Sequence, residues 1–168
     1  MNERSVIAVR PMRESDEAFV FSSWLTAASE AWARRWAHES GAELTGLTAA
    51  QIAAIPRTFT RAHVAGILNR PTCTVRVACV EDDTDAIVGW CAAEPGVVHW
   101  THVKHYARRT GIGAMLLDNA HPGWRTHSRM RCSFLSHAWP VCRAQGWSFD
   151  PHAEGETHAA PEPVALVG

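Results

Sequence analysis

The chain has 168 residues, of which 46% are hydrophobic and 20% are charged, and its formal net charge is −1. This length suits one domain with a substantial core and is too short for two ordinary domains, and the composition excludes a disordered chain. The balanced charge excludes a global basic field for nucleic acid, but it leaves room for a local patch. We expect one domain over residues 1–150 and a poorly ordered tail over 151–168, where Pro and acidic residues occur.

The sequence predicts a cytoplasmic protein without a membrane partner. No segment approaches the roughly 20 continuous apolar residues that span a bilayer, and the N-terminus lacks the basic-then-apolar layout of a signal peptide. Five cysteines, an odd number, form no CxxC pair and lie in apolar runs such as "TCTVRVACV". Such cysteines are typical of buried thiols in a reducing compartment.

The first half of the chain is expected to be one strand followed by helices. Pro11 stops the strand, Ser15 or Asp16 can cap the long helix, and Pro56 separates the last two helices. Thr48 and Gln51 have the spacing of a capping box. The pattern predicts a strand over 5–12, a helix over 13–40, a short helix over 49–55 and a helix over 57–70.

The second half changes to strands joined by short turns. Strands are predicted over 72–82, 86–94 and 97–106, a helix over 112–121, a strand over 129–136, a helix over 138–146 and a strand over 147–151. The first three of these strands should form an antiparallel meander. The element order therefore predicts an α+β fold in which helices cover a twisted, mostly antiparallel sheet.

A glycine loop, "HYARRTGIGAML", separates the meander from the helix that follows it. Gly111 and Gly113 lack a Cβ, so an anion can approach the backbone N–H groups at the start of the helix, where the helix dipole is positive. Arg108 and Arg109 add positive charge. The alternative is a tight strand-to-helix turn with two arginines in solvent.

Two better-known phosphate loops do not fit these residues. A Walker loop needs Gly-x-x-x-x-Gly-Lys-Ser/Thr, which this stretch lacks. The Gly-x-Gly-x-x-Gly loop of dinucleotide-binding proteins would need a third glycine at position 116, which is Leu, and its strand would not belong to a meander.

"VKHYARRTGIGAMLL" resembles the coenzyme A loop of the GCN5-related N-acetyltransferases, whose signature is Arg/Gln-x-x-Gly-x-Gly/Ala. Arg108, Gly111 and Gly113 match the signature in register. "VRPMRESD", "IVGWCAAE" and "AQGW" resemble the family's opening strand, third strand and late "xxGF" element, so the resemblance covers most of residues 6–150. It implies a three-layer fold, acetyl-CoA as co-substrate and an amine-bearing acceptor.

The resemblance also implies which residues bind the cofactor. The backbone of Val103 and His105 would orient the pantetheine arm, and the loop would hold the pyrophosphate. The residues implied for the loop are Arg108, Arg109, Thr110, Gly111, Ile112, Gly113 and Ala114.

The proton-transfer groups depart from the family pattern. The position four residues before Gly146, where the family often has a tyrosine acid, is Cys142, which we interpret as a buried helix residue. A base is still needed to deprotonate the amine, and histidine titrates near neutral pH. We therefore take His99, His102 and His137 as candidate catalytic residues, although each alone is more often structural.

The spacing of His99, His102 and His105 bears on metal binding. On an ideal strand His99 and His105 share a face and His102 lies opposite, unless a bulge intervenes. Three rings on alternating faces cannot converge on one ion, so we expect no metal.

Two other functions stay open. The Arg- and His-containing stretch over 121–131 could contact a nucleic acid backbone or be a solvated loop. The opening of the chain is generally similar to acetyltransferase-like proteins of bacteriophages, a group that includes modifiers of DNA bases. A non-catalytic binding module on the same fold is the third reading, and a homodimer is compatible with all three.

Overall fold

Six strands of the chain form one sheet, and their order in space follows their order in sequence. The computed structural model describes residues 6–39, 60–126, 130–134, 139–150 and 153–155. The strands are β1 (Ile7–Pro11), β2 (Thr74–Val80), β3 (Asp83–Glu94), β4 (Val97–Val103), β5 (Arg131–Cys132) and β6 (Ser148–Phe149). The helices are η1 (Glu14–Asp16), α1 (Glu17–Glu39), η2 (His105–Ala107), α3 (Ile112–Ala120) and α4 (Trp139–Ala144), and residues 60–68 are also helical.

The sheet is antiparallel from β1 to β4 and parallel from β4 to β6. The predicted α+β class, the mostly antiparallel sheet and the meander of β2, β3 and β4 are therefore confirmed. The strand expected over 129–136 is much shorter, because β5 contains only Arg131 and Cys132. Parallel pairing depends on contacts distant in sequence, which a local pattern does not reveal.

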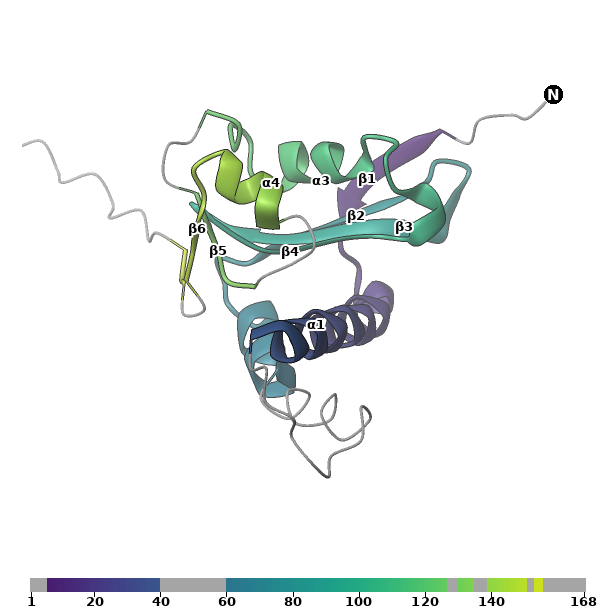
Figure 1. Cartoon of the computed structure of the whole chain (residues 1–168). Helices are drawn as coiled ribbons and strands as arrows, with labels where there is room; N and C mark the ends of the chain where they lie inside the picture. Colours follow the sequence, from purple (N-terminus) through teal and green to yellow (C-terminus); the bar gives the residue numbers. More distant parts are fainter. Residues whose placement is uncertain (1–5, 40–59, 127–129, 135–138, 151–152, 156–168) are drawn as a thin grey trace, which may run out of the picture.

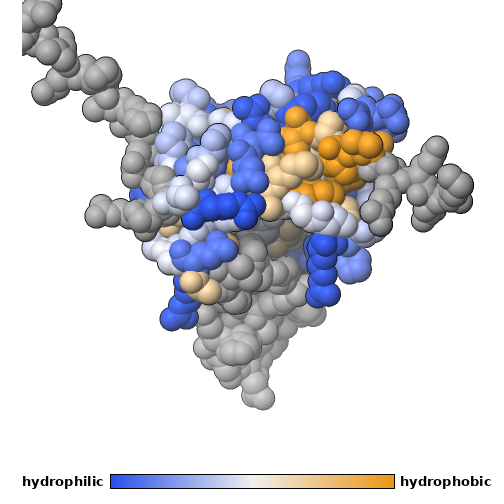
Figure 2. All heavy atoms as spheres, turned by 90° about the horizontal axis from the view of Figure 1, so that it is seen from above, coloured by the Kyte–Doolittle hydropathy of each residue, from blue (hydrophilic) through white to orange (hydrophobic). Residues whose placement is uncertain are grey.

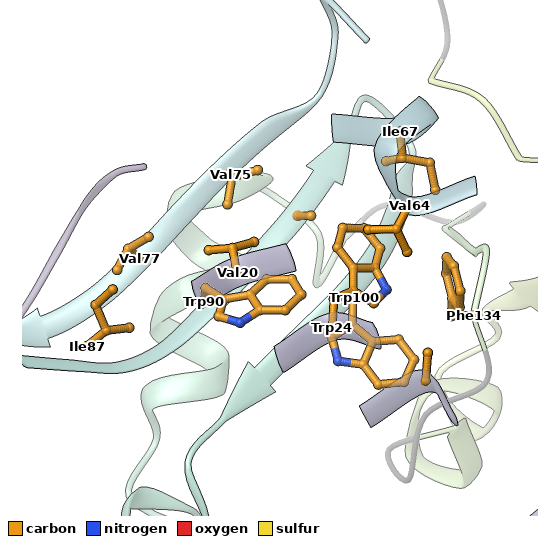
Figure 3. Close-up of a cluster of buried hydrophobic side chains, with 12 residues drawn as sticks. Val20, Trp24, Val64, Ile67, Val75, Val77, Ile87, Trp90, Trp100 and Phe134 are labelled. Carbon is orange, nitrogen blue, oxygen red and sulfur yellow. The ribbon is translucent and has the colours of Figure 1, made fainter. Parts of the chain in front are cut away.

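The helices cover both faces of the sheet. Figure 1 shows α3 and α4 above the sheet and α1, with the helical residues 60–68, below it. Strand side chains point alternately to the two faces, so each face carries its own apolar cluster. The lower cluster is drawn in Figure 3 and contains Val20, Trp24, Ala28, Val64, Ile67, Val75, Val77, Ile87, Trp90, Ala92, Trp100 and Phe134. The upper one contains Ala78, Val88, Cys91, Ala93, Val98, Ala107, Ile112, Leu116, Trp124, Met130, Cys132 and Trp147.

The start of α1 differs in detail from the expected cap. Asp16 is buried, and its carboxylate accepts hydrogen bonds from the backbone N–H of Arg13 (2.7 Å) and from the Arg10 guanidinium (2.5 and 3.0 Å). The side chain therefore joins β1 to the short η1 turn before α1 begins at Glu17.

Some sequence predictions fall outside the described residues. These are the capping box at Thr48, the helix over 49–55, His137 and most of the tail over 151–168. The helix over 57–70 is confirmed for residues 60–68, and residues 153–155 of the tail lie against β3, where the Gly155 N–H donates to Glu94.

The α3 face carries a mixed surface. In Figure 2, which views this face, an apolar area lies among hydrophilic side chains. Partly buried Ile7, Val9, Val80 and Leu117 pack against the upper cluster, and Val6 is 61% exposed. No described helix is long and apolar enough to cross a membrane.

Candidate functional site

The glycine loop leaves β4 at its last residue and enters α3. Gly89 of β3 lets both β4 and α3 lie close to it, because a Cβ there would be 2.6 Å from the His102 carbonyl oxygen of β4 and 3.3 Å from Leu116 Cδ1 of α3. Leu116 is fully buried and Ile112 nearly so. These contacts fix the N-terminal end of α3 beside the end of β4.

The backbone of the loop is shaped to leave its N–H groups free. Arg109 has φ 64°, which is uncommon outside glycine, and Gly111, the residue before α3, has φ 88°. In the described part of the chain, no acceptor meets the backbone N–H groups of residues 109–114; the first helical bond is from Met115 to the Gly111 carbonyl. Consecutive free N–H groups at a helix start form a site for an anion.

Space for a ligand is present at both glycines. A Cβ on Gly111 would have no atom within 4 Å, and one on Gly113 would meet only Val103 Cγ2, at 3.9 Å. The open approach at Gly111, next to free donors and the exposed side chains of Arg108 and Arg109, fits a pyrophosphate.

Side-chain hydrogen bonds hold this loop in shape. The Thr110 hydroxyl donates to the Ala107 carbonyl (2.7 Å), and Arg108 Nε donates to the Val103 carbonyl (3.0 Å). The structure therefore brings Val103 and the loop together. His105 lies in η2 and is exposed, as is Tyr106 at 74%.

β5 pairs with only the first part of β4. β5 pairs with β4 only at Val97 and Val98, and the Ser133 N–H then donates to the Val98 carbonyl at 3.4 Å. Beyond Val98, the described part of β5 gives β4 no strand partner on that side. β4 also contains a bulge, because Ala93 pairs with Val98 while Ala92 pairs with Trp100. His99 is the extra residue.

His99 lies in the middle of a buried row of hydrogen-bonded polar side chains. Its Nδ1 is 2.7 Å from Ser133 Oγ and its Nε2 is 2.9 Å from Glu94 Oε2, and all three side chains are at most 4% exposed. Glu94 also accepts hydrogen bonds from Arg70, Thr72 and the Gly155 N–H. Both nitrogens of His99 are therefore occupied, and neither reaches a substrate directly.

The charge states of Glu94 and His99 follow from burial and hydrogen bonding. Burial pushes the pKa of Glu94 upward, but the hydrogen bonds from Thr72, His99, Gly155 and Arg70 outweigh it, so its pKa lies below the usual value. Burial lowers the pKa of His99, and the hydrogen bond with Glu94 compensates only in part. A neutral imidazole beside an ionised carboxylate results.

His102 is half-buried, whereas His99 is buried and His105 is exposed. It stacks on Trp90 of the lower cluster, with ring centroids 6.0 Å apart. Burial and the charges of Arg108 and Lys104 lower its pKa, while Glu30 raises it. A neutral imidazole can accept a proton, so His102 keeps the chemistry expected of a base. His137 lies outside the described residues.

Cys142 of α4 has the features of a core thiol. It packs against the upper cluster, and burial raises its pKa. All five cysteines are described and none forms a disulfide. Among the described residues there is no group of three His, Cys, Asp or Glu that could hold a metal ion.

Sequence reasoning did not find Glu94, Ser133 or Arg70. Glu94 ends an apolar strand five residues before His99, which is a weak local signal of a buried pair. Ser133 carries no such signal, because its contact with His99 spans 34 residues and requires β5 to lie beside β4.

Comparisons with known proteins give structural likenesses alone, since no protein-family model and no curated protein matches this sequence. The chain is similar to the aminoglycoside N-acetyltransferase AAC(6')-Iy in complex with CoA, with TM-score 0.47, 14% identity and 94% of each chain covered. It is similar to PaiA N-acetyltransferase from Thermoplasma acidophilum in complex with coenzyme A, with TM-score 0.40, 13% identity, and 68% of this chain and 69% of that one covered.

A protein assigned to the GNAT family of acetyltransferases, from Desulfovibrio desulfuricans, is also similar, with TM-score 0.35, 16% identity and 68% of this chain covered. The chain spans 63% of the length of that protein. Because these TM-scores lie below 0.5, function has to be inferred from the residues of this chain.

Proposed function

We propose that this protein is an acyl-CoA-dependent N-acyltransferase of the GNAT type, which transfers an acetyl group from acetyl-CoA to an amine by direct attack. The observation that carries the proposal is the run of free N–H groups over residues 109–114, with open space at Gly111. Acetyl-CoA supplies the activated thioester. The loop residues from Arg108 to Ala114 would hold its pyrophosphate.

The rest of the site supports the same reaction. β5 pairs with β4 only at Val97 and Val98, so an extended arm would lie along the later part of β4, which ends at Val103. Two described histidines, His99 and His102, lie on β4, and both have a lowered pKa. His102 and His137 remain candidate bases for the amine, and backbone groups of Val103 and His105 remain candidates for orienting the arm.

Isothermal titration with acetyl-CoA, combined with a Gly111→Val variant, tests the loop. A branched side chain at Gly111 would occupy the space at the free N–H groups. Losing one or two charge-assisted hydrogen bonds, each ~1.5–3 kcal/mol, should weaken binding by roughly ten- to ten-thousand-fold. Arg108→Ala should cost less, because an exposed arginine is screened by solvent and salt.

Gly146→Val is the matched control. Gly146 also has positive φ (82°) and open space around its Cβ position, but it lies outside the loop. Both variants carry the same kind of backbone strain, so they should lose similar amounts of stability, and only Gly111→Val should lose acetyl-CoA binding. Wild-type protein that does not bind acetyl-CoA, or a folded Gly111→Val that binds as the wild type does, would contradict the proposal.

The nucleic-acid alternative receives no support from the described part of residues 121–131. Arg125 is paired with Asp118 and stacks on Trp124, and Arg131 is paired with Asp150. These cations are already partnered within the protein. We therefore carry only the acyltransferase forward.

A further inference from the structure

The outer edge of β1 carries backbone groups that the sheet does not use. β1 is the first strand in the order of the sheet and pairs only with β2. At its two ends, the Val6 carbonyl accepts a hydrogen bond from β2 (2.8 Å) and the Met12 N–H donates one to β2 (3.1 Å), and the register between them has no shift. The backbone groups of the even-numbered residues therefore point at β2, whereas those of Ile7 and Val9 point away from the sheet.

Ile7 and Val9 are the two residues that make up this free edge. In the described part of the chain, no donor or acceptor meets their backbone N–H and C=O groups. Pro11, the next residue that points outward, has no N–H, and its carbonyl accepts a hydrogen bond from Arg10 Nη1 at 3.1 Å. The edge thus offers one free donor and one free acceptor at each of two residues.

The devices that usually protect an edge strand do not cover Ile7 and Val9. Natural edge strands carry charged side chains, prolines or bulges that prevent pairing with another chain. The charged residue of β1, Arg10, is turned toward its own protein, where it binds Asp16 and the Thr84 carbonyl. The side chains of Ile7 and Val9 are half-buried against the upper cluster, on the face where Figure 2 shows an apolar area. The free edge is therefore also apolar.

We propose that β1 pairs with β1 of a second copy of this chain, antiparallel about a two-fold axis, so that the two sheets become one. With Ala8 opposite its counterpart, Ile7 of each copy lies opposite Val9 of the other. Each of these pairs exchanges both N–H···O=C hydrogen bonds, so every free group of the edge gains a partner. Pairing centred on Val9 would instead place Ile7 opposite Pro11, which has no N–H to donate.

Side chains fit the same register on both faces of the sheet. On the face that α3 covers, Ile7 and Val9 of one copy meet Val9 and Ile7 of the other, and such cross-strand aliphatic pairs stabilise a sheet. The upper clusters of the two copies then become continuous. On the opposite face, Ala8 meets its counterpart, and its small side chain suits the close approach of a pair that is not hydrogen-bonded.

The charges around β1 favour the antiparallel orientation. Positions 81–83, where β2 turns into β3 beside Val6, are three exposed acidic residues. The other end of β1 is followed by Arg13 and Glu14, whose charges balance. Antiparallel pairing keeps the two acidic turns at opposite ends of the shared edge and brings each one toward the end of its partner that carries Arg13. Parallel pairing would put the two acidic turns side by side, where they repel.

Amide hydrogen exchange of the full chain, combined with sedimentation velocity, tests the pairing directly. The amide hydrogens of Ile7 and Val9 should exchange slowly at high protein concentration and fast after dilution, in step with the loss of a species of twice the mass. Those of Ala8 and Arg10 point at β2 and should be protected at both concentrations, which makes them the internal control. A chain that stays monomeric at every soluble concentration would overturn the proposal. Protection of Ile7 and Val9 that does not depend on concentration would also overturn it, because another segment of the same chain would then cover the edge.

Val9→Pro removes an outward N–H and no hydrogen bond to β2, and edge strands tolerate proline in this orientation. Loss of this hydrogen bond and of its symmetry mate should weaken association by roughly 5- to 150-fold. Val9→Thr is the matched control, because it keeps the N–H and the branched shape, and it should associate as the wild type does. Equal association of Val9→Pro and Val9→Thr would overturn the pairing.

Charged substitutions at Ala8 test the register without changing the backbone. Ala8→Glu and Ala8→Lys each place like charges directly opposite one another across the axis, so each variant should associate more weakly with itself than the wild type does. A mixture of the two variants places opposite charges there and should associate more tightly than either variant alone. Thermal melts establish that both variants are folded. A mixture of folded variants that associates no better than its components would overturn the pairing about Ala8.

Discussion

At the scale of single residues, the Arg10–Asp16 pair gives a pH-dependent prediction. The hydrogen bond with Arg10 is the main reason that the pKa of Asp16 lies below its usual value, despite burial. A depressed pKa means that this stabilisation is present above about pH 4, the unfolded value, and is lost as pH falls through the folded value. Asp16→Asn should therefore lower Tm near neutral pH, and its difference from wild type should shrink in acid.

Thermal melts across that pH range measure the effect. Asp85→Asn is a suitable control, because Asp85 is 88% exposed and its contact with Arg13 is long, at 3.7 Å. An exposed pair of this kind contributes little. If both variants melted alike at every pH, the buried pair would have no special role.

The residues of the candidate site differ in how far the sequence reveals them. Arg108, Gly111 and Gly113 lie within six positions, so a local spacing reveals them. The partners of His99 are not local in this way. Burial of an acid and a hydroxyl around one imidazole depends on which strands become neighbours, and that information is spread over β3, β4 and β5.

At the scale of elements, the close approach of β4 and α3 to β3 depends on Gly89. Gly89→Ala should disturb the pairing of β3 with β4 and crowd Leu116 of α3, because its Cβ would be 2.6 Å from the His102 carbonyl oxygen and 3.3 Å from Leu116 Cδ1. We expect a loss of stability of about 1–3 kcal/mol, the usual cost of overpacking, and weaker acetyl-CoA binding in the folded fraction. Urea unfolding and titration measure the two effects.

Gly66→Ala should have the opposite effect on stability. Gly66 lies in the helical residues 60–68 and has open space around its Cβ position. Replacing a helical glycine by alanine should stabilise the protein by up to about 1 kcal/mol. A Gly89→Ala protein as stable as wild type would mean that β4 and α3 do not approach Gly89 of β3 as closely as described.

The accuracy of the element predictions follows the range of the interactions. The meander strands and α3 have strong internal periodicity and short turns, and they are confirmed. β5 and β6 contain two residues each and pair in parallel, so their extent is set by neighbours and not by pattern. The bulge at His99 changes which side chains share a face of β4, and only the observed register reveals it.

At the scale of the whole molecule, two clusters packed on one sheet position the site. The tryptophans contribute to both: Trp24 contacts Trp90 and Phe134 below the sheet, and Trp124 contacts Trp147 above it. β4 runs between the two clusters, so its end and the loop are held by packing on both faces. A substitution that displaces either layer of helices should therefore also displace the site.

Residues 153–155 lie against Glu94 at the end of β3, and Gly155 gives the last prediction. Its N–H donates to Glu94 at 3.0 Å, and a Cβ at this position would be 2.6 Å from Glu94 Cβ and 3.2 Å from Pro95 Cδ. Gly155→Ala should displace the segment and remove one hydrogen bond to a charged group, worth about 1.5–3 kcal/mol. The pKa of Glu94 should rise toward its usual value, since the Gly155 N–H helps to lower it. Thermal melts should then show a lower Tm than wild type near neutral pH, with a difference that shrinks in acid as Glu94 is protonated in both proteins. A Gly155→Ala protein with an unchanged melting profile would mean that the segment does not hold Glu94 in solution.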